Sequence, residues 1–142
     1  MDSNHLAVIR RTADAEPSDV AAQLAAAYAC DSEGLEAEAV VYYDRAWSLG
    51  VPQDHRHDFL VGYGSTLRNV GRLDESIEIL EIGESEFPGD LAPSAFLALT
   101  LNRAGRHDEA VGLLIYLLVA SGGPGVERYA RALGSYAELL RS

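Results

Sequence analysis

The sequence predicts an all-α fold, an α-α superhelix or solenoid of three helix pairs followed by a C-terminal capping helix. The first observation is a repeat: GRLDESIEIL, from Gly71 to Leu80, returns as GRHDEAVGLL, from Gly105 to Leu114, 34 residues later. The second is that apolar residues on both sides of each copy recur at helical spacing. A single helix pair cannot bury its apolar face alone, so we expect the copies to stack.

We expect residues 1–16 to be a loose N-terminal segment and residues 17–142 to form one domain. The first, least regular repeat covers residues 18–52, with helices over 21–30 and 35–49 and a turn between them. Its turn glycine, Gly34, lies 37 residues before Gly71 instead of 34. We assign the extra residues to a polar loop over 50–57.

The second repeat covers residues 57–90. Leu60, Tyr63, Gly64 and Leu67 have the spacing of one helical face. Gly71 then ends the first helix, because glycine accepts the left-handed conformation found at helix ends. Asp74, like Asp108 in the next copy, is expected to begin the second helix as a capping carboxylate, and Pro88 ends that helix.

The third repeat covers residues 91–124, and a capping helix covers 125–141. The apolar stretch Leu113–Ala120 of the third repeat predicts a helix buried on several sides. The run Gly122–Gly125 is a strong break. An amphipathic helix should follow, with its apolar face formed by Val126, Tyr129, Ala130, Leu133, Tyr136, Ala137 and Leu140. We therefore expect seven helices and no sheet.

These repeats resemble the tetratricopeptide repeat family, a 34-residue helix–turn–helix with small, large and proline residues at set places. The matching small residues are Gly64 and Ala98 in the first helices and Ala110 in a second helix, with Gly71, Gly105 and Pro88 at the turns and end. Leu60 and Ser94 stand where the family has tryptophan, and Leu117 where it has alanine. The run from Gly64 to Asn69 is also similar to a bacterial subfamily of these repeats.

The resemblance implies a protein-binding adaptor or scaffold with no catalysis, in which the first helices line a concave groove for a peptide or a partner protein. The candidate binding residues form one stripe on each of two first helices: Val61, Ser65, Arg68, Asn69, and Ala95, Leu99, Asn102, Arg103. We expect Arg68-Asn69 to face Asn102-Arg103, where asparagine would hold peptide amides and arginine a carboxylate. The first repeat would contribute a stripe near Ala22, Ala26 and Ala29. The alternative is a homodimer whose groove is filled by its own or a neighbour's N-terminal segment, with the apolar run Leu6–Ile9.

The charge composition limits the classes of partner that the chain can bind. The net charge is −11, and all 11 basic residues are arginine. Nucleic-acid and anionic-membrane binders need an excess of cations that neutralise phosphates, whereas this chain has 22 acidic residues against 11 basic ones. We therefore expect no nucleic acid and no docking on an anionic membrane. The apolar runs are too short for a signal peptide or a membrane span, and we expect a cytoplasmic protein.

Few residues carry a pattern for chemistry. DHRHD, from Asp54 to Asp58, holds two histidines and two aspartates, but His55 and His57 are two apart, and such residues diverge on a helix. We interpret it as a polar loop and expect no metal site and no cofactor. Cys30, the only cysteine, is expected to be a buried core residue instead of a reactive thiol.

Overall fold

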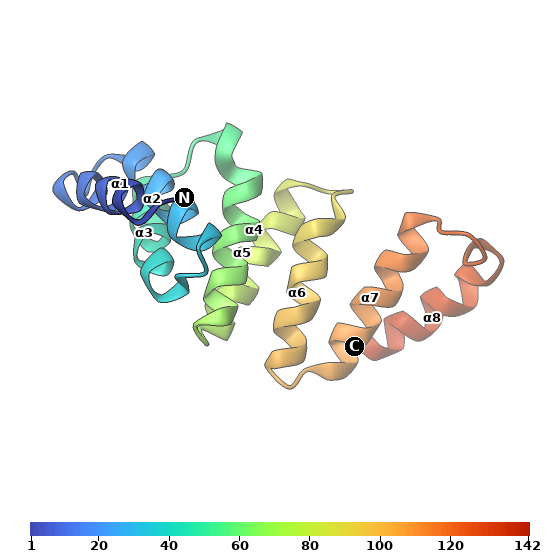
Figure 1. Cartoon of the computed structure of the whole chain (residues 1–142). Helices are drawn as coiled ribbons and strands as arrows, with labels where there is room; N and C mark the ends of the chain where they lie inside the picture. The colour runs from blue at the N-terminus through green and yellow to red at the C-terminus, as the bar shows by residue number, and fades with distance from the viewer. The chain divides into compact units, whose positions relative to one another are not determined.

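The computed structural model describes residues 1–142, which form eight α-helices and one 3-10 turn without a strand. Contacts divide the chain into two compact units, Met1–Arg72 and Leu73–Ser142, and each is described by itself. The all-α prediction is confirmed (Figure 1). The boundary between the units falls inside the second predicted repeat, directly after the turn that follows its first helix.

Unit 1 runs from blue to green in Figure 1 and contains α1 (Ser3–Ala15), α2 (Val20–Ser32), α3 (Glu36–Leu49) and α4 (Gln53–Asn69). Unit 2 contains α5 (Leu73–Glu86), α6 (Leu91–Arg103), α7 (His107–Ser121), a 3-10 turn (Glu127–Tyr129) and α8 (Ala130–Arg141). None of these helices is both long and apolar enough to span a bilayer.

The turn after the first helix has the same geometry in all three repeats. Gly34, Gly71 and Gly105 have φ values of +74°, +86° and +80°, which only glycine adopts without strain. The next residue donates its backbone N–H to a carbonyl five residues earlier, at 2.9 Å each time: Leu35 to Cys30, Arg72 to Leu67, and Arg106 to Leu101. This is the Schellman helix end, and the irregular first copy shares it with the other two.

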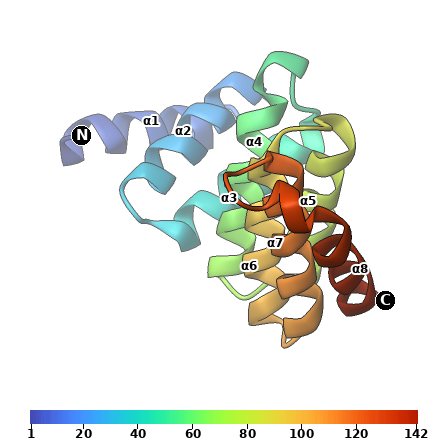
Figure 2. The same cartoon turned by 90° about the vertical axis from the view of Figure 1, so that its right-hand side faces the viewer.

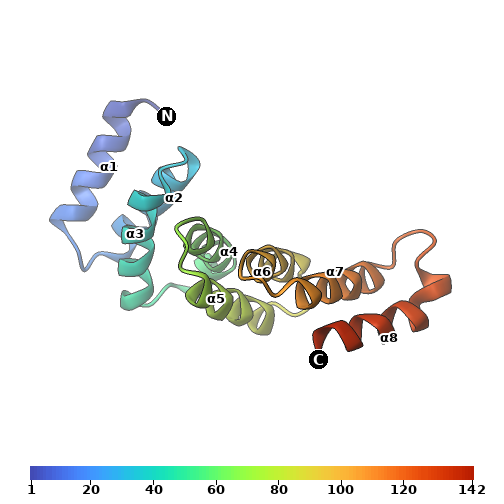
Figure 3. The same ribbon diagram turned by 90° about the horizontal axis from the view of Figure 1, so that it is seen from below.

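The segment expected to be loose, residues 1–16, is instead mostly the helix α1, so the structure has one α-helix more than the sequence predicts. Asp2 caps it by accepting from the His5 backbone N–H at 2.7 Å. At the other end, the buried Gln23 side chain donates to the carbonyl oxygens of Ala13, at 2.8 Å, and Glu16, at 3.1 Å. Figure 3 shows α1 beside α2, and Ala13 is fully buried. These contacts make α1 a part of unit 1.

An aromatic cluster joins α3 to α4 in unit 1. Tyr43 is fully buried, with its ring centroid 5.5 Å from those of both Phe59 and Tyr63. Trp47 stacks on Phe59 at 6.0 Å. Such pairs add to the free energy gained by burying the rings. Tyr43 and Trp47 are therefore packing residues of unit 1.

Unit 2 is built around the faces that α5, α6 and α7 turn toward one another. The buried cluster contains Ile77, Leu80, Leu97, Ala98, Leu101, Ala110, Leu113 and Leu117. The Ser76 and Thr100 hydroxyls bond to each other at 2.9 Å within it. In Figure 2, α8 lies along α7, and these two helices are in close contact.

Several helix starts differ from the prediction. The extra residues of the first repeat do not form a loop over 50–57, because α4 already begins at Gln53 and takes DHRHD into its first turns. Asp74 and Asp108 lie inside the first turns of α5 and α7, and α7 has no side-chain cap. They still meet the positive end of the helix dipole. The capping helix begins at Ala130, later than residue 125.

Candidate functional site

The predicted binding residues on α4 are Val61, Ser65, Arg68 and Asn69, and we refer to them as the α4 stripe. All four are partly exposed, whereas Leu60 and Leu67 on the neighbouring face are fully buried. Burial of one face and access to the next follow from helical spacing. The stripe thus presents one apolar side chain and three polar ones.

A hydrogen-bond network orders the polar end of the α4 stripe. Arg68 donates from Nη2 to the Ser65 hydroxyl at 3.3 Å and to Asn69 Oδ1 at 3.2 Å. Asn69 in turn donates from Nδ2 to Glu36 Oε1 of α3 at 2.5 Å. The guanidinium is therefore held by groups of its own unit, and Asn69 links it to the Glu36 carboxylate.

Glu36 is a member of this site that the sequence argument missed. It lies in the first turn of α3, where an acidic residue is already explained by the helix dipole. It is 33 residues from Asn69, so local spacing gives no sign of their contact.

The predicted residues on α6, the α6 stripe, are Ala95, Leu99, Asn102 and Arg103. Leu99 is 52% exposed, and Asn102 and Arg103 are exposed at the end of the helix. Asn102 Oδ1 lies 2.8 Å from His107 Nδ1, so the amide is tied to the start of α7. This stripe offers an exposed apolar side chain next to a polar helix end.

The two stripes belong to different units, α4 to unit 1 and α6 to unit 2. That Arg68-Asn69 face Asn102-Arg103 across one groove stays a prediction. The stripe expected on the first repeat is largely closed, since Ala26 and Ala29 are buried in unit 1 and only Ala22 is half-buried.

The groups considered for chemistry have structural partners. His57 Nδ1 lies 3.0 Å from the Asp58 carboxylate, and no three His, Cys, Asp or Glu side chains gather as metal ligands would. Cys30 is fully buried, as expected, and burial raises the pKa of its thiol. Burial, and then the hydrogen bond to Asp31, also raise the pKa of Tyr43.

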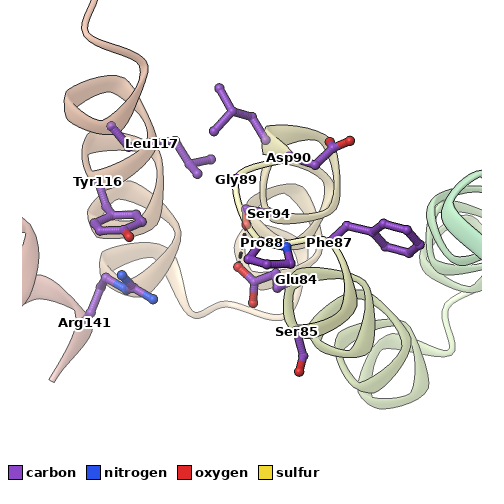
Figure 4. Close-up of a pocket in the computed structure, with 12 residues that line it drawn as sticks. Glu84, Ser85, Phe87, Pro88, Gly89, Asp90, Ser94, Tyr116, Leu117 and Arg141 are labelled. Carbon is purple, nitrogen blue, oxygen red and sulfur yellow. Dashed lines mark hydrogen bonds between the residues drawn. The ribbon is translucent and has the colours of Figure 1, made fainter.

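Unit 2 contains a hollow of about 550 Å³ between the α5–α6 connection and α7 with α8 (Figure 4). Glu84 accepts from the Ser94 hydroxyl at 2.6 Å, and the Arg141 guanidinium lies 5.2 Å from the Tyr116 ring centroid. Phe87 and Asp90 point away from the hollow in Figure 4. Its volume is within the range of ligand pockets, but its charged groups are engaged in contacts between helices.

The outward sides of α7 and α8 depart from the sequence prediction. The stretch Leu113–Ala120 is not buried on several sides, because Leu114, Tyr116 and Leu118 are each about half exposed. Tyr129 and Tyr136, expected on the inner face of the capping helix, are also exposed. Periodicity identified an apolar face in each helix but did not show which apolar residues another helix would cover.

The sequence profile of the tetratricopeptide repeat family, described as "Tetratrico peptide repeat", matches residues 20–140. The chain belongs to the tetratricopeptide repeat family. Comparisons with curated proteins and with solved structures find no match. Repeats of this family generally act as protein–protein interaction modules and are typically non-catalytic.

The span of the match assigns parts of the chain to the tetratricopeptide array. It begins at the first residue of α2, so α1 lies outside the family's pattern. It ends inside α8, so the array includes the final helix. Leu133-Gly134 of α8 has the same large–small order as Tyr63-Gly64 of α4.

Proposed function

We propose that this tetratricopeptide repeat protein is an adaptor that binds a peptide or partner protein through the α4 stripe and the α6 stripe, without catalysing a reaction. The observation that carries the proposal is the division of each first helix into a buried face and an accessible stripe. Each stripe combines an apolar contact, Val61 or Leu99, with an arginine near the end of the helix. Mixed stripes of this kind suit a protein ligand.

The side chains of the stripes indicate the chemistry of the ligand. Arginine binds carboxylates in a bidentate manner, and it is enriched where binding energy concentrates. Leu99, 52% exposed, would bury an apolar side chain of the ligand. We therefore expect an extended segment that carries an apolar residue and a carboxylate. The net charge of −11 opposes ligands that are acidic throughout.

The test begins with selection of binders to the immobilised chain from a library of random peptides. Fluorescence anisotropy then compares the affinity of the selected peptides for the wild type and for Arg68→Ala/Arg103→Ala. The matched control is Arg11→Ala/Arg131→Ala, which removes the same charge from exposed positions on α1 and α8.

Loss of two charged hydrogen-bonding groups should weaken binding by roughly 10-fold or more, whereas the control should keep the wild-type affinity apart from a small electrostatic change. Equal affinities for the two double variants would show that the stripes are not the binding site. The two single variants then show whether the stripes act together, because coupled contacts give non-additive losses.

The alternative occupant of the groove, the N-terminal segment, is less favoured than a separate ligand. Besides the Gln23 contacts, Asp14 of α1 accepts from the Tyr42 hydroxyl at 3.1 Å and from Arg45 at 3.0 Å. Filling a neighbour's groove would require α1 to leave these contacts. A synthetic peptide of residues 3–15 should therefore not bind the full chain. Saturable binding of that peptide would favour the groove-filled homodimer.

A further inference from the structure

Three residues form an exposed apolar stripe along α7. Val111, Leu114 and Leu118, which we name the α7 stripe, are 48%, 49% and 51% exposed. Their spacing of three and four residues places them on one side of the helix. A single exposed leucine needs no explanation, but three aligned on one face do.

The preceding repeat shows which helix packs on the side of α5 that corresponds to the α7 stripe. The 34-residue register aligns the α7 stripe with Ile77, Leu80 and Glu84 of α5. Ile77 is 7% exposed and Leu80 fully buried, in the cluster with Leu97 and Leu101 of α6. Glu84 accepts a hydrogen bond from Ser94, also on α6. In the second repeat, the equivalent stripe is covered by the first helix of the next repeat.

The first repeat has the same arrangement inside unit 1. Aligning Gly34 with Gly105 places Tyr43 and Trp47 of α3 at the positions of Leu114 and Leu118. Both aromatic side chains pack on Phe59 of α4, with ring centroids 5.5 Å and 6.0 Å apart. In each of these two repeats, the position therefore contacts the first helix of the next repeat.

The last helix does not fill this position in the third repeat, because α8 packs against another side of α7. A Cβ atom added at Gly112 would lie 2.9 Å from the Ala137 carbonyl oxygen and 3.0 Å from Leu140 Cβ. Successive residues on a helix point in directions about 100° apart, so the side that carries Gly112 differs from the side that carries Val111. Although α8 follows α7 directly in the chain, it leaves the α7 stripe open.

The distribution of net charge along the chain bears on whether a second copy can approach the α7 stripe. Residues 107–142 contain four carboxylates and three arginines, a net charge of −1, whereas residues 1–106 carry −10. Two copies of an acidic chain repel each other, and this repulsion is smallest where the local charge is close to zero. The hairpin of α7 and α8 can thus meet another copy with little of this repulsion.

We propose that the α7 stripe is a homodimer interface, in which α7 of a second copy takes the place of a following repeat. The stripe suits a two-fold axis, since antiparallel α7 helices that cross near Leu114 bring Val111 of one copy against Leu118 of the other. Such an interface uses the same patch on both copies and closes on itself. The interface contains no residue of the α4 stripe or the α6 stripe, and a dimer carries two copies of each stripe, so a dimeric adaptor would bind bivalently.

The oligomeric state of the full chain tests the proposal. Light scattering after gel filtration should show the mass rising from 15.3 kDa toward twice that value as concentration increases over about 1 µM to 1 mM. Leu114→Glu/Leu118→Glu should remain at 15.3 kDa, because it places four carboxylates in the interface. Glutamate is a good helix former, so circular dichroism should show unchanged helicity.

The matched control is Tyr136→Glu/Leu139→Glu, which adds the same charge at exposed apolar positions of α8. It should dimerise like the wild type. A wild type that stays monomeric throughout the range, an α7 variant that still dimerises, or a control that is equally monomeric would each overturn the proposal.

Cross-linking tests the predicted axis. Leu114→Cys places a thiol beside its own counterpart at the two-fold axis, so oxidation should give a covalent dimer on a non-reducing gel. Leu139→Cys, 72% exposed on α8, is the control, and the fully buried Cys30 should stay unreactive in both. Cross-linking of Leu114→Cys no faster than that of Leu139→Cys would contradict the axis.

Discussion

Replacing Gly112 by alanine tests where α8 sits on α7. The substitution adds one methyl group at the contact between the helices, without altering charge or a polar group. Alanine is also the better helix former, by about 1 kcal/mol. If α8 were elsewhere, Gly112→Ala would therefore stabilise unit 2.

The structure gives the size of the opposing effect. The new Cβ would lie 2.7 Å from Arg141 Cγ, 3.0 Å from Leu140 Cβ and 2.9 Å from the Ala137 carbonyl oxygen. The long arginine side chain can move aside, but the carbonyl oxygen belongs to the backbone of α8 and moves only with the helix. Overpacking of this kind costs about 1–3 kcal/mol. After the gain in helix propensity, we expect a net loss of about 0–2 kcal/mol.

Gly134→Ala is the matched control. Gly134 lies inside α8, and a Cβ atom there would meet nothing within 4 Å. It should therefore show only the gain in helix propensity, about 1 kcal/mol. Urea unfolding followed by circular dichroism measures both variants. Because the propensity gain is common to both, their difference isolates the close contact, expected at about 1–3 kcal/mol.

Equal stabilisation by the two substitutions would refute the reasoning. It would mean that α8 does not contact α7 at Gly112. Another side of α7, including the α7 stripe, would then be available to α8. The proposed homodimer would lose its structural basis, whereas the adaptor function, which depends on α4 and α6, would be unaffected.

Three further predictions concern single side chains. Leu80→Ala should lower the free energy of unfolding, measured with urea, by about 2–5 kcal/mol, because Leu80 is fully buried. Leu114→Ala, at the equivalent but half-exposed position, should lower the free energy of unfolding of the monomer by less than about 1 kcal/mol. Tyr43→Phe removes the 2.6 Å hydrogen bond to Asp31 and should cost about 1–3 kcal/mol by the same assay. Cys30 should react with a thiol reagent only after denaturant unfolds unit 1, because burial raises its pKa, and rapid reaction in the native chain would show an open core.

Local patterns predicted most of the helices. Gly71 and Gly105 end helices as expected, because the left-handed conformation is a property of single residues. The N-terminal helix was not predicted, because contacts with residues outside its own segment stabilise it. Its last turn is stabilised by Gln23, and Asp14 is held by Arg45 of α3, 31 residues away, and neither contact leaves a periodic signal in residues 1–16.

The candidate site was predictable as two faces of helices but not as a set of contacts. Helical spacing separates Val61 and Ser65 from the buried Leu60, and the structure keeps that separation. It gives no sign that Glu36 holds Asn69, because the two residues lie at ends of different helices.

The sequence by itself determined the repeat, its helix pairs and the glycine turns, since these depend on residues close together in the chain. Only the tertiary structure decided which apolar faces are covered. Leu80 and Leu114 are the same residue at the same place in two repeats, yet Leu80 is buried and Leu114 is half exposed. The difference is whether a following helix packs on that side, and the packing of α8 at Gly112 leaves Leu114 open. Burial depends on neighbouring elements, and no following helix packs on the side of α7 that carries Leu114.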